Sequence, residues 1–173
     1  MKSIAIHVAL LSACLATLAI PVQAQTRLLA CPGGNYTAEA LTAINALRAH
    51  NQRCGKAVGA LTLDATLLQV AQDHANDMAS KNRFSHANSR GDQIGKRARQ
   101  SGYAYSMVGE NIAAGQQSVA EVITTWLDSP SHCSNMMTAS FVHMGISCQY
   151  NPKSEYQTYW TLTLGSPSPS TGH

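Results

Sequence analysis

Two histidines and one glutamate stand apart from the other polar residues because their surroundings could support chemistry. His86 comes directly after the predicted end of a helix, and His132 is the third residue of a helix predicted to begin at Ser129-Pro130. Backbone N–H groups and the helix dipole disfavour a proton on an imidazole at such a position, so a neutral ring there can accept a hydrogen bond or bind a metal. Glu110 is the single carboxylate between residues 101 and 119, which makes it either a buried hydrogen-bond hub or a functional group.

The spacing of these three residues does not decide whether they form one site. They are separated by 24 and 22 positions, and the sequence contains no His-Glu-x-x-His motif. The residues alone therefore leave open a shared His/Glu/His site and three separate structural roles. Among the other histidines, His74 lies on the apolar face of a predicted helix and is expected to be a hydrogen-bonded core residue, whereas His143 has no obvious partner.

Hydrophobic periodicity and capping residues predict the elements that position these side chains. Helices are expected from Thr37, from Asp64, from Asp92 to Gly102, from the capping box at Ser118 to Asp128, and from Ser129 to Met137. Two strands, 144–150 and 156–164, are predicted to pair antiparallel around a turn at 151–154, and residues 166–173 to form a loose tail. The predicted fold class is therefore α+β, with about four helices packed on a small antiparallel sheet.

Composition and the first residues favour a single exported domain. The chain has 173 residues, of which 12% are charged, and its 12 Lys and Arg against 9 Asp and Glu give no sign of the strongly basic face of a nucleic-acid binder. A basic start, a short apolar run and small residues before Ala24 predict a signal peptide over residues 1–24, followed by an N-terminal segment over 25–36. No transmembrane segment is expected. Lipoprotein cleavage before Cys14 is the alternative, but it would leave the apolar residues 15–20 on the mature chain.

Removal of the signal peptide leaves four cysteines, Cys31, Cys54, Cys133 and Cys148. In an exported chain this number favours two disulfides, for which three connectivities are possible. We expect the pairs that are near in sequence, Cys31–Cys54 and Cys133–Cys148, each contributing about 3 kcal/mol by closing a short loop. A zinc site is the weaker interpretation because the sequence contains no Cys-x-x-Cys.

Several short motifs occur in a characteristic order along the chain. They include Phe84-Ser85-His86, Gly109-Glu110-Asn111-Ile112-Ala113, Trp126-Leu127-Asp128-Ser129-Pro130-Ser131-His132, Met144-Gly145-Ile146 and Tyr159-Trp160-Thr161. This ordered set resembles the CAP superfamily, the cysteine-rich secretory, antigen 5 and pathogenesis-related class-one proteins, in its compact bacterial branch. The resemblance covers residues 37–165, which we expect to be one CAP/SCP domain. It implies an α-β-α sandwich with a central cleft, lined in eukaryotic members by two histidines and two acidic residues that can bind a divalent metal.

The resemblance carries three of these four cleft residues over to this chain. His86, Glu110 and His132 match by motif, and the trio could act in catalysis or hold Zn²⁺ through the two histidines. The second acidic residue is not matched, because Ser129 stands at its place with Asp128 beside it, and Glu121 is already explained by its capping box. This departure puts a full four-residue metal site in doubt.

Two classes of function fit these expectations. We favour a secreted, monomeric binding or interaction module for an extracellular lipid, sterol, glycan or protein, because no nucleophile is obvious beside the trio and CAP relatives are associated with such roles. The alternative is a metal-assisted hydrolase or other cleft enzyme that uses the trio. A third possibility is that the trio only ties the helices to the sheet.

A group of basic residues flanks His86 in the sequence. Its members are Lys81, Arg83, Arg90, Lys96, Arg97 and Arg99. They are expected either to form a solvated helix face or to attract anionic lipid headgroups or polysaccharide.

Overall fold

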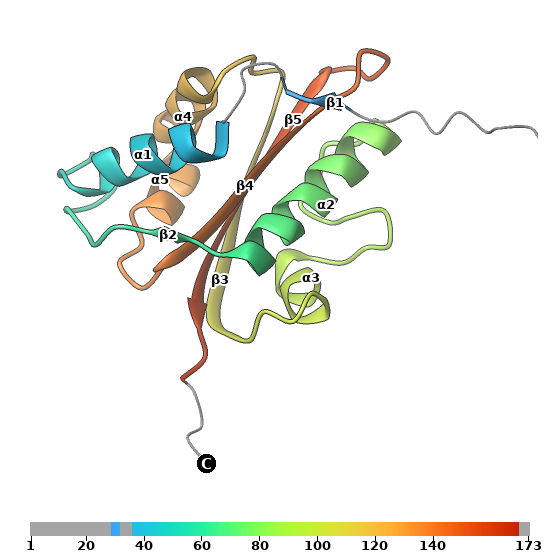
Figure 1. Cartoon of the computed structure of the whole chain (residues 1–173). Helices are drawn as coiled ribbons and strands as arrows, with labels where there is room; N and C mark the ends of the chain where they lie inside the picture. The colour runs from blue at the N-terminus through green and yellow to red at the C-terminus, as the bar shows by residue number, and fades with distance from the viewer. Residues whose placement is uncertain (1–28, 32–35, 170–173) are drawn as a thin grey trace, which may run out of the picture.

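The computed structural model describes residues 29–31 and 36–169, whose helices cover both faces of one mostly antiparallel sheet (Figure 1). The helices are α1 (Tyr36–Arg48), α2 (Ala65–Lys81), α3 (Ile94–Gln100), α4 (Val119–Asp128) and α5 (Pro130–Met136). The strands are β1 (Leu29–Ala30), β2 (Thr62–Leu63), β3 (Tyr105–Ala114), β4 (His143–Tyr150) and β5 (Thr158–Pro167). The α+β class is confirmed, while the expected signal peptide lies outside the described residues.

The sheet has the order β1-β4-β5-β3, and β2 pairs in parallel with the start of β4. The antiparallel β4–β5 pair is confirmed, with Cys148 opposite Trp160. β5 extends to Pro167, so the first residues of the expected tail belong to a strand instead, and Ser166 Oγ donates a hydrogen bond to the carbonyl of Ser140.

The long edge strand β3 was not predicted. It pairs with β5 along most of its length, and its residues 110–113 are all buried. A strand that is covered on both faces lacks the polar–apolar alternation by which half-buried strands are recognised, and the small residues of this segment hide it further.

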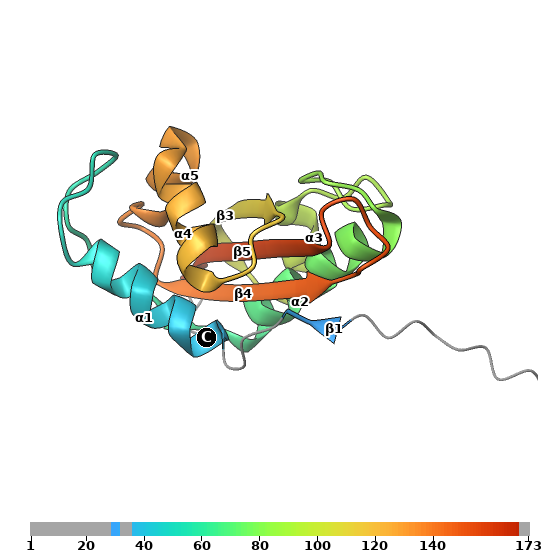
Figure 2. The ribbon, with the colours of Figure 1, turned by 90° about the horizontal axis from the view of Figure 1, so that it is seen from above.

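The two faces of the sheet differ in character, and this difference fixes which helix packs where. Large apolar side chains of β4 and β5, such as Ile146 and Leu162, form the main core together with α1, α4 and α5. The opposite face carries smaller and polar residues, among them Gly145 and Thr163, whose hydroxyl donates to the carbonyl of Leu67 on α2 over 2.9 Å. Figures 1 and 2 show α1, α4 and α5 on one side and α2 and α3 on the other, which confirms the α-β-α sandwich.

Local capping starts the helices largely where the sequence indicates. Asp64 Oδ1 accepts a hydrogen bond from the Leu67 N–H at the start of α2, and Ser118 Oγ accepts one from the Glu121 N–H at the start of α4. α3 begins at Ile94, two residues later than predicted, because the buried Asp92 is held in the preceding loop, where its N–H donates to Asn88 Oδ1.

The predicted disulfide pairing is wrong. The bonds join Cys31 to Cys148 and Cys54 to Cys133, across 117 and 79 positions of the chain. β1 lies antiparallel to β4, and continuing its register sets Cys31 opposite Cys148. Strand pairing and tertiary packing therefore decided the partners, not proximity in sequence. Loops of this length contribute about 4–5 kcal/mol each in the chain-entropy model, more than the short loops expected.

Gly145 provides a test of this packing because α2 crosses β4 with its backbone almost touching the strand. A Cβ at Gly145 would lie 2.3 Å from the backbone carbon of Leu67, whereas a Cβ at Gly59 would have no neighbour within 4 Å. We expect Gly145→Ala to lower the free energy of unfolding by about 3 kcal/mol and Gly59→Ala to change it by less than about 1 kcal/mol. Urea denaturation measures both, and equal stability of the two variants would contradict the close α2–β4 contact.

Candidate functional site

Strand β3 presents its Gly-Glu-Asn motif to three different surroundings. Gly109 leaves room for an aromatic ring, since a Cβ there would lie 2.9 Å from Cζ of Phe141. The next two side chains point to opposite faces of the sheet because successive residues of a strand alternate. Glu110 contacts residues of the α2 and α3 side, and Asn111 contacts α5.

Glu110 forms a buried ion pair with Arg97 of α3. Arg97 Nη2 donates to Glu110 Oε2 over 2.5 Å, and the two residues are only 6% and 5% exposed. Removing two charges from water costs several kcal/mol per ion, so such a pair needs good geometry and further hydrogen bonds. These are present, because Nη2 also donates to the carbonyl of His86 and the second carboxylate oxygen has its own partner.

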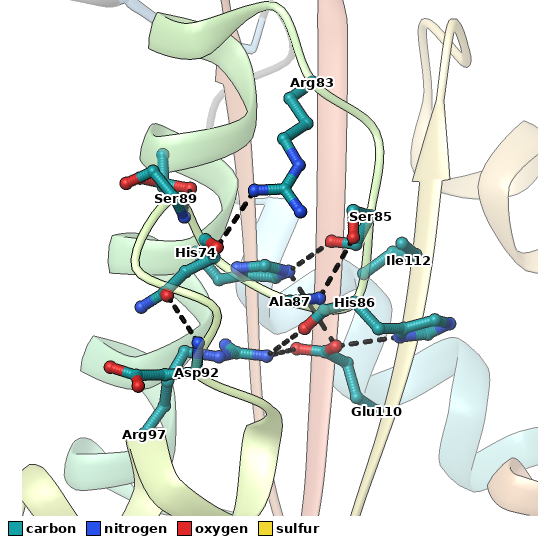
Figure 3. A network of polar contacts seen from close by, with 12 residues as sticks. His74, Arg83, Ser85, His86, Ala87, Ser89, Asp92, Arg97, Glu110 and Ile112 are labelled. Carbon is teal, nitrogen blue, oxygen red and sulfur yellow. Dashed lines mark hydrogen bonds and ion pairs between the residues drawn. The ribbon is translucent and has the colours of Figure 1, made fainter.

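That partner is His86, the first of the two predicted histidines. Its Nδ1–H donates to Glu110 Oε1 over 2.9 Å, while 51% of its side chain is exposed. Figure 3 shows Arg97 and His86 approaching the Glu110 carboxylate from opposite sides. A carboxylate beside Nδ1 fixes the proton on that nitrogen of the neutral ring, which leaves Nε2 as a hydrogen-bond acceptor.

His74 joins the same network from α2. Its Nε2–H donates to the carbonyl of Ser85 over 3.0 Å, which confirms the expected hydrogen-bonded core residue. The same nitrogen lies 3.8 Å from Glu110 Oε1 and the side chain is fully buried. Burial lowers the pKa of His74, and the positive charge of Arg97 adds to this, while Glu110 opposes it. The ring is therefore neutral near pH 7.

His132 does not touch Glu110. It is the third residue of α5 and half-buried, and none of the hydrogen bonds among the described residues involves its ring; Nδ1 is fully buried. Burial lowers the pKa of His132, and a proton on His86 would lower it further. The predicted preference for a neutral ring is thus supported, but its main cause is burial instead of the helix dipole.

Two asparagines connect α5 to β3 and were not singled out by the sequence reasoning. Asn135 Nδ2 donates to the carbonyl of Glu110 and to Asn111 Oδ1, over 3.2 and 2.9 Å. Asn111 Nδ2 in turn donates to the carbonyl of His132 over 3.0 Å. The backbone of His132 is thereby positioned by the residue next to Glu110. Asn111 lies in one of the motifs quoted above, which was the available signal.

The residues considered for the missing second acid do not join the network. Asp128 is paired with Arg53 at the surface, with side chains 73% and 60% exposed. Ser129 Oγ lies 3.2 Å from Ser131 Oγ, and Glu121 Oε2 accepts a hydrogen bond from the Gln117 N–H over 2.8 Å. The structure therefore agrees with the departure from the four-residue pattern.

The basic cluster is not one solvated face. Arg97 is buried against Glu110, which corrects the expectation for this residue. Arg90 and Lys96 both pair with Asp92, over 3.3 and 2.6 Å, and Arg99 lies 4.6 Å above the ring of Tyr105. Much of the positive charge that could have attracted an anionic surface is therefore paired with residues of the protein itself.

The donor atoms around His86 do not complete the three-ligand zinc centre that the trio suggests. Both oxygens of Glu110 are committed to Arg97 and His86, and across residues 29–31 and 36–169 no group of three or more His, Cys, Asp or Glu is arranged to hold a metal ion. Two imidazoles remain as donors. A zinc-binding role for His86 and His132 stays a prediction.

The fold and these motifs define a CAP domain, and comparison with known proteins agrees. The model of the cysteine-rich secretory protein (CAP) family matches residues 41–164, so the chain belongs to this family. The Bacillus subtilis protein YkwD is 34% identical over 86 residues, which span 50% of this chain but only 34% of YkwD.

Solved structures show the same fold at lower identity. An extracellular SCP-domain protein from Bacillus anthracis has a TM-score of 0.64 at 24% identity, covering 76% of this chain and 40% of that one. An outer surface protein of Borrelia burgdorferi has a TM-score of 0.62 at 18% identity, covering 76% of this chain and 89% of that one. Among the residues described here, none of the helices is long and apolar enough to cross a membrane.

The lowered pKa values predict that acid weakens the fold. His74 and His132 bind a proton less readily in the folded chain than in the unfolded chain, where the ordinary value is 6.5. Stability is therefore complete above about pH 6.5 and decreases below it, by at most about 1.4 kcal/mol per pH unit for each group. We expect the melting temperature to fall between about pH 7.5 and about pH 5.5.

Two histidine variants test the assignment. His132→Asn should make the decrease in melting temperature smaller, while His50→Asn, at the exposed end of α1, should leave it unchanged. An identical pH dependence in His132→Asn and the unmodified protein would contradict a lowered pKa at His132.

Proposed function

We propose that this protein is a secreted binding or interaction module that recognises an extracellular ligand with the rings of His86 and His132, at the open side of the Glu110 network. The observation that carries the proposal is the state of Glu110. Its two carboxylate oxygens are held by Arg97 and His86, and it is buried. It orients His86, whose half-exposed ring is left with one free nitrogen toward a ligand.

The same geometry argues against an enzyme built on the trio. A general base must reach the proton that it removes, and a carboxylate neutralised by a buried arginine is poorly suited to that role. Nucleophilic catalysis needs a hydroxyl or thiol bonded to the base, and within the described part of the chain no such group is hydrogen-bonded to the ring of His86. A positioned, exposed imidazole without a nucleophile suits recognition better than turnover.

Export is part of the proposal. Two disulfides link segments that are distant in sequence, as is typical of proteins in an oxidising compartment. The two solved relatives named above are described as an extracellular protein and an outer surface protein. We therefore place the mature start after Ala24, the CAP domain over residues 37–165, and the working form as a monomer in the periplasm or outside the cell.

Native mass spectrometry of the protein purified from its own secreted fraction tests the proposal. The unmodified protein and His50→Ala, which changes an exposed histidine far from the network in sequence, are expected to carry a noncovalent ligand mass. His86→Ala is expected to lose that mass while keeping its melting temperature within a few degrees, because the ring is half-exposed. The same spectra give the mature N-terminus and the oligomeric state.

Turnover assays supply the opposing outcome. Chromogenic ester, phosphate, glycoside and peptide substrates are offered with and without added Zn²⁺. We expect no turnover that depends on His86. Turnover that is lost in His86→Ala and kept in His50→Ala would overturn the binding proposal in favour of the hydrolase. In the mass spectra, an equal ligand mass on His86→Ala and on the unmodified protein would contradict ligand binding at the His86 ring.

A further inference from the structure

Two exposed aromatic rings lie together at one end of the sandwich. Phe84 follows α2, and Tyr156 lies in the connection between β4 and β5. They are 47% and 41% exposed, and their ring centroids are 6.0 Å apart. Figure 1 shows the end of α2 beside this connection. Single exposed apolar residues need no explanation, whereas neighbouring ones form a patch that can serve for interaction. Residues 81–84 and 153–156 together form what we call the aromatic surface.

Hydrogen bonds fix the two segments of the aromatic surface to each other and to α2. Asn82 Oδ1 accepts a hydrogen bond from the Glu155 N–H over 2.7 Å. The Arg83 N–H, in the residue before Phe84, donates to the carbonyl of Met78 over 3.0 Å. The backbone donor that precedes each ring is therefore already satisfied, which lowers the cost of moving this part of the molecule out of water.

Three cations flank the rings. Lys81, Arg83 and Lys153 are exposed, and none of them forms an ion pair with a described residue. Each is within three positions of a ring, a span of at most about 11 Å along the chain, which is close to one Debye length at ~0.1 M salt. Glu155 is the one acid in the two segments, so three positive charges against one negative charge leave the aromatic surface basic.

We propose that the aromatic surface docks the protein on a lipid bilayer that carries anionic headgroups. Aromatic side chains are enriched at the boundary between headgroups and acyl chains, and each Lys or Arg near an anionic membrane adds to the attraction. The side chain of Phe84 has no polar atom to bond the hydroxyls of a polysaccharide, so the patch favours a bilayer over a soluble anionic polymer. Docking does not require the ligand proposed at the His86 ring, and the two proposals can fail separately.

Co-sedimentation of the mature protein with lipid vesicles tests the attraction. Vesicles of phosphatidylcholine alone are compared with vesicles of equal parts phosphatidylcholine and phosphatidylglycerol. We expect the anionic vesicles to bind about tenfold more tightly at ~0.1 M salt and to lose this advantage at ~1 M, where the Debye length falls to about 3 Å. Equal partition into both kinds of vesicle at low salt, or partition into neither, would overturn the proposal.

Charge variants locate the attraction on this surface. Lys153→Gln should lower the partition into anionic vesicles about fivefold, and Glu155→Gln should raise it by a similar factor, an increase that misfolding does not produce. Lys56→Gln, which removes an exposed lysine between α1 and β2, should change the partition by less than about twofold. A decrease in Glu155→Gln, or equal effects of Lys153→Gln and Lys56→Gln, would contradict docking through the aromatic surface.

Aromatic variants separate a bilayer from a soluble polyanion. Phe84→Ala and Tyr156→Ala should each lower the partition severalfold, because their rings leave water on docking. Met107→Ala is the matched control, since Met107 is 44% exposed but lies near the start of β3, opposite Ser166. All of these variants should keep their melting temperature within a few degrees. Weaker binding in Lys153→Gln with unchanged binding in Phe84→Ala would mean that charge alone acts, and would overturn docking on a bilayer.

Discussion

The buried ion pair between Arg97 and Glu110 is the contact on which the rest of the site depends. Glu110 lies on an edge strand and would be an isolated buried charge without the guanidinium from α3. An unpaired buried charge destabilises a fold by more than most single contacts stabilise it. The ion pair therefore fixes the position of α3 relative to β3. The same carboxylate orients the His86 ring, and the His74 ring of α2 lies close to this carboxylate. One acid thus joins two helices, one strand and the loop between the helices.

This arrangement makes the carboxylate a positioning group instead of a reagent. The network has an outer side, where the half-exposed His86 ring offers a free nitrogen, and an inner side, where the fully buried His74 lies against the carboxylate. The outer side is suited to hydrogen-bonded recognition of a ligand. The asparagines of β3 and α5 extend the network to the other face of the sheet, where they position the backbone of His132 on α5.

Local signals in the sequence predicted what local physics decides. The caps at Asp64 and Ser118, the proline at the start of α5 and the β4–β5 pair all depend on neighbouring residues and were found. The link between His86 and Glu110 was reached through motif order, because no short-range spacing encodes it. What depends on tertiary packing was missed or wrong. β3 is covered on both faces and shows no alternation, Cys31 finds its partner through strand register, and Arg97 resembles a surface residue of a basic helix until Glu110 is placed beside it.

A double-mutant cycle between Arg97 and Glu110 tests the central claim most directly. Unfolding free energies are measured for Arg97→Met, Glu110→Gln and the double variant, with Arg53→Met and Asp128→Asn as the exposed control pair. The account predicts that Arg97→Met alone costs about 3–5 kcal/mol, that the buried pair is coupled by about 2 kcal/mol or more, and that the control pair is coupled by less than about 1 kcal/mol. Additivity of the two buried substitutions to within about 0.5 kcal/mol would contradict the account, because it would mean that Glu110 does not depend on Arg97.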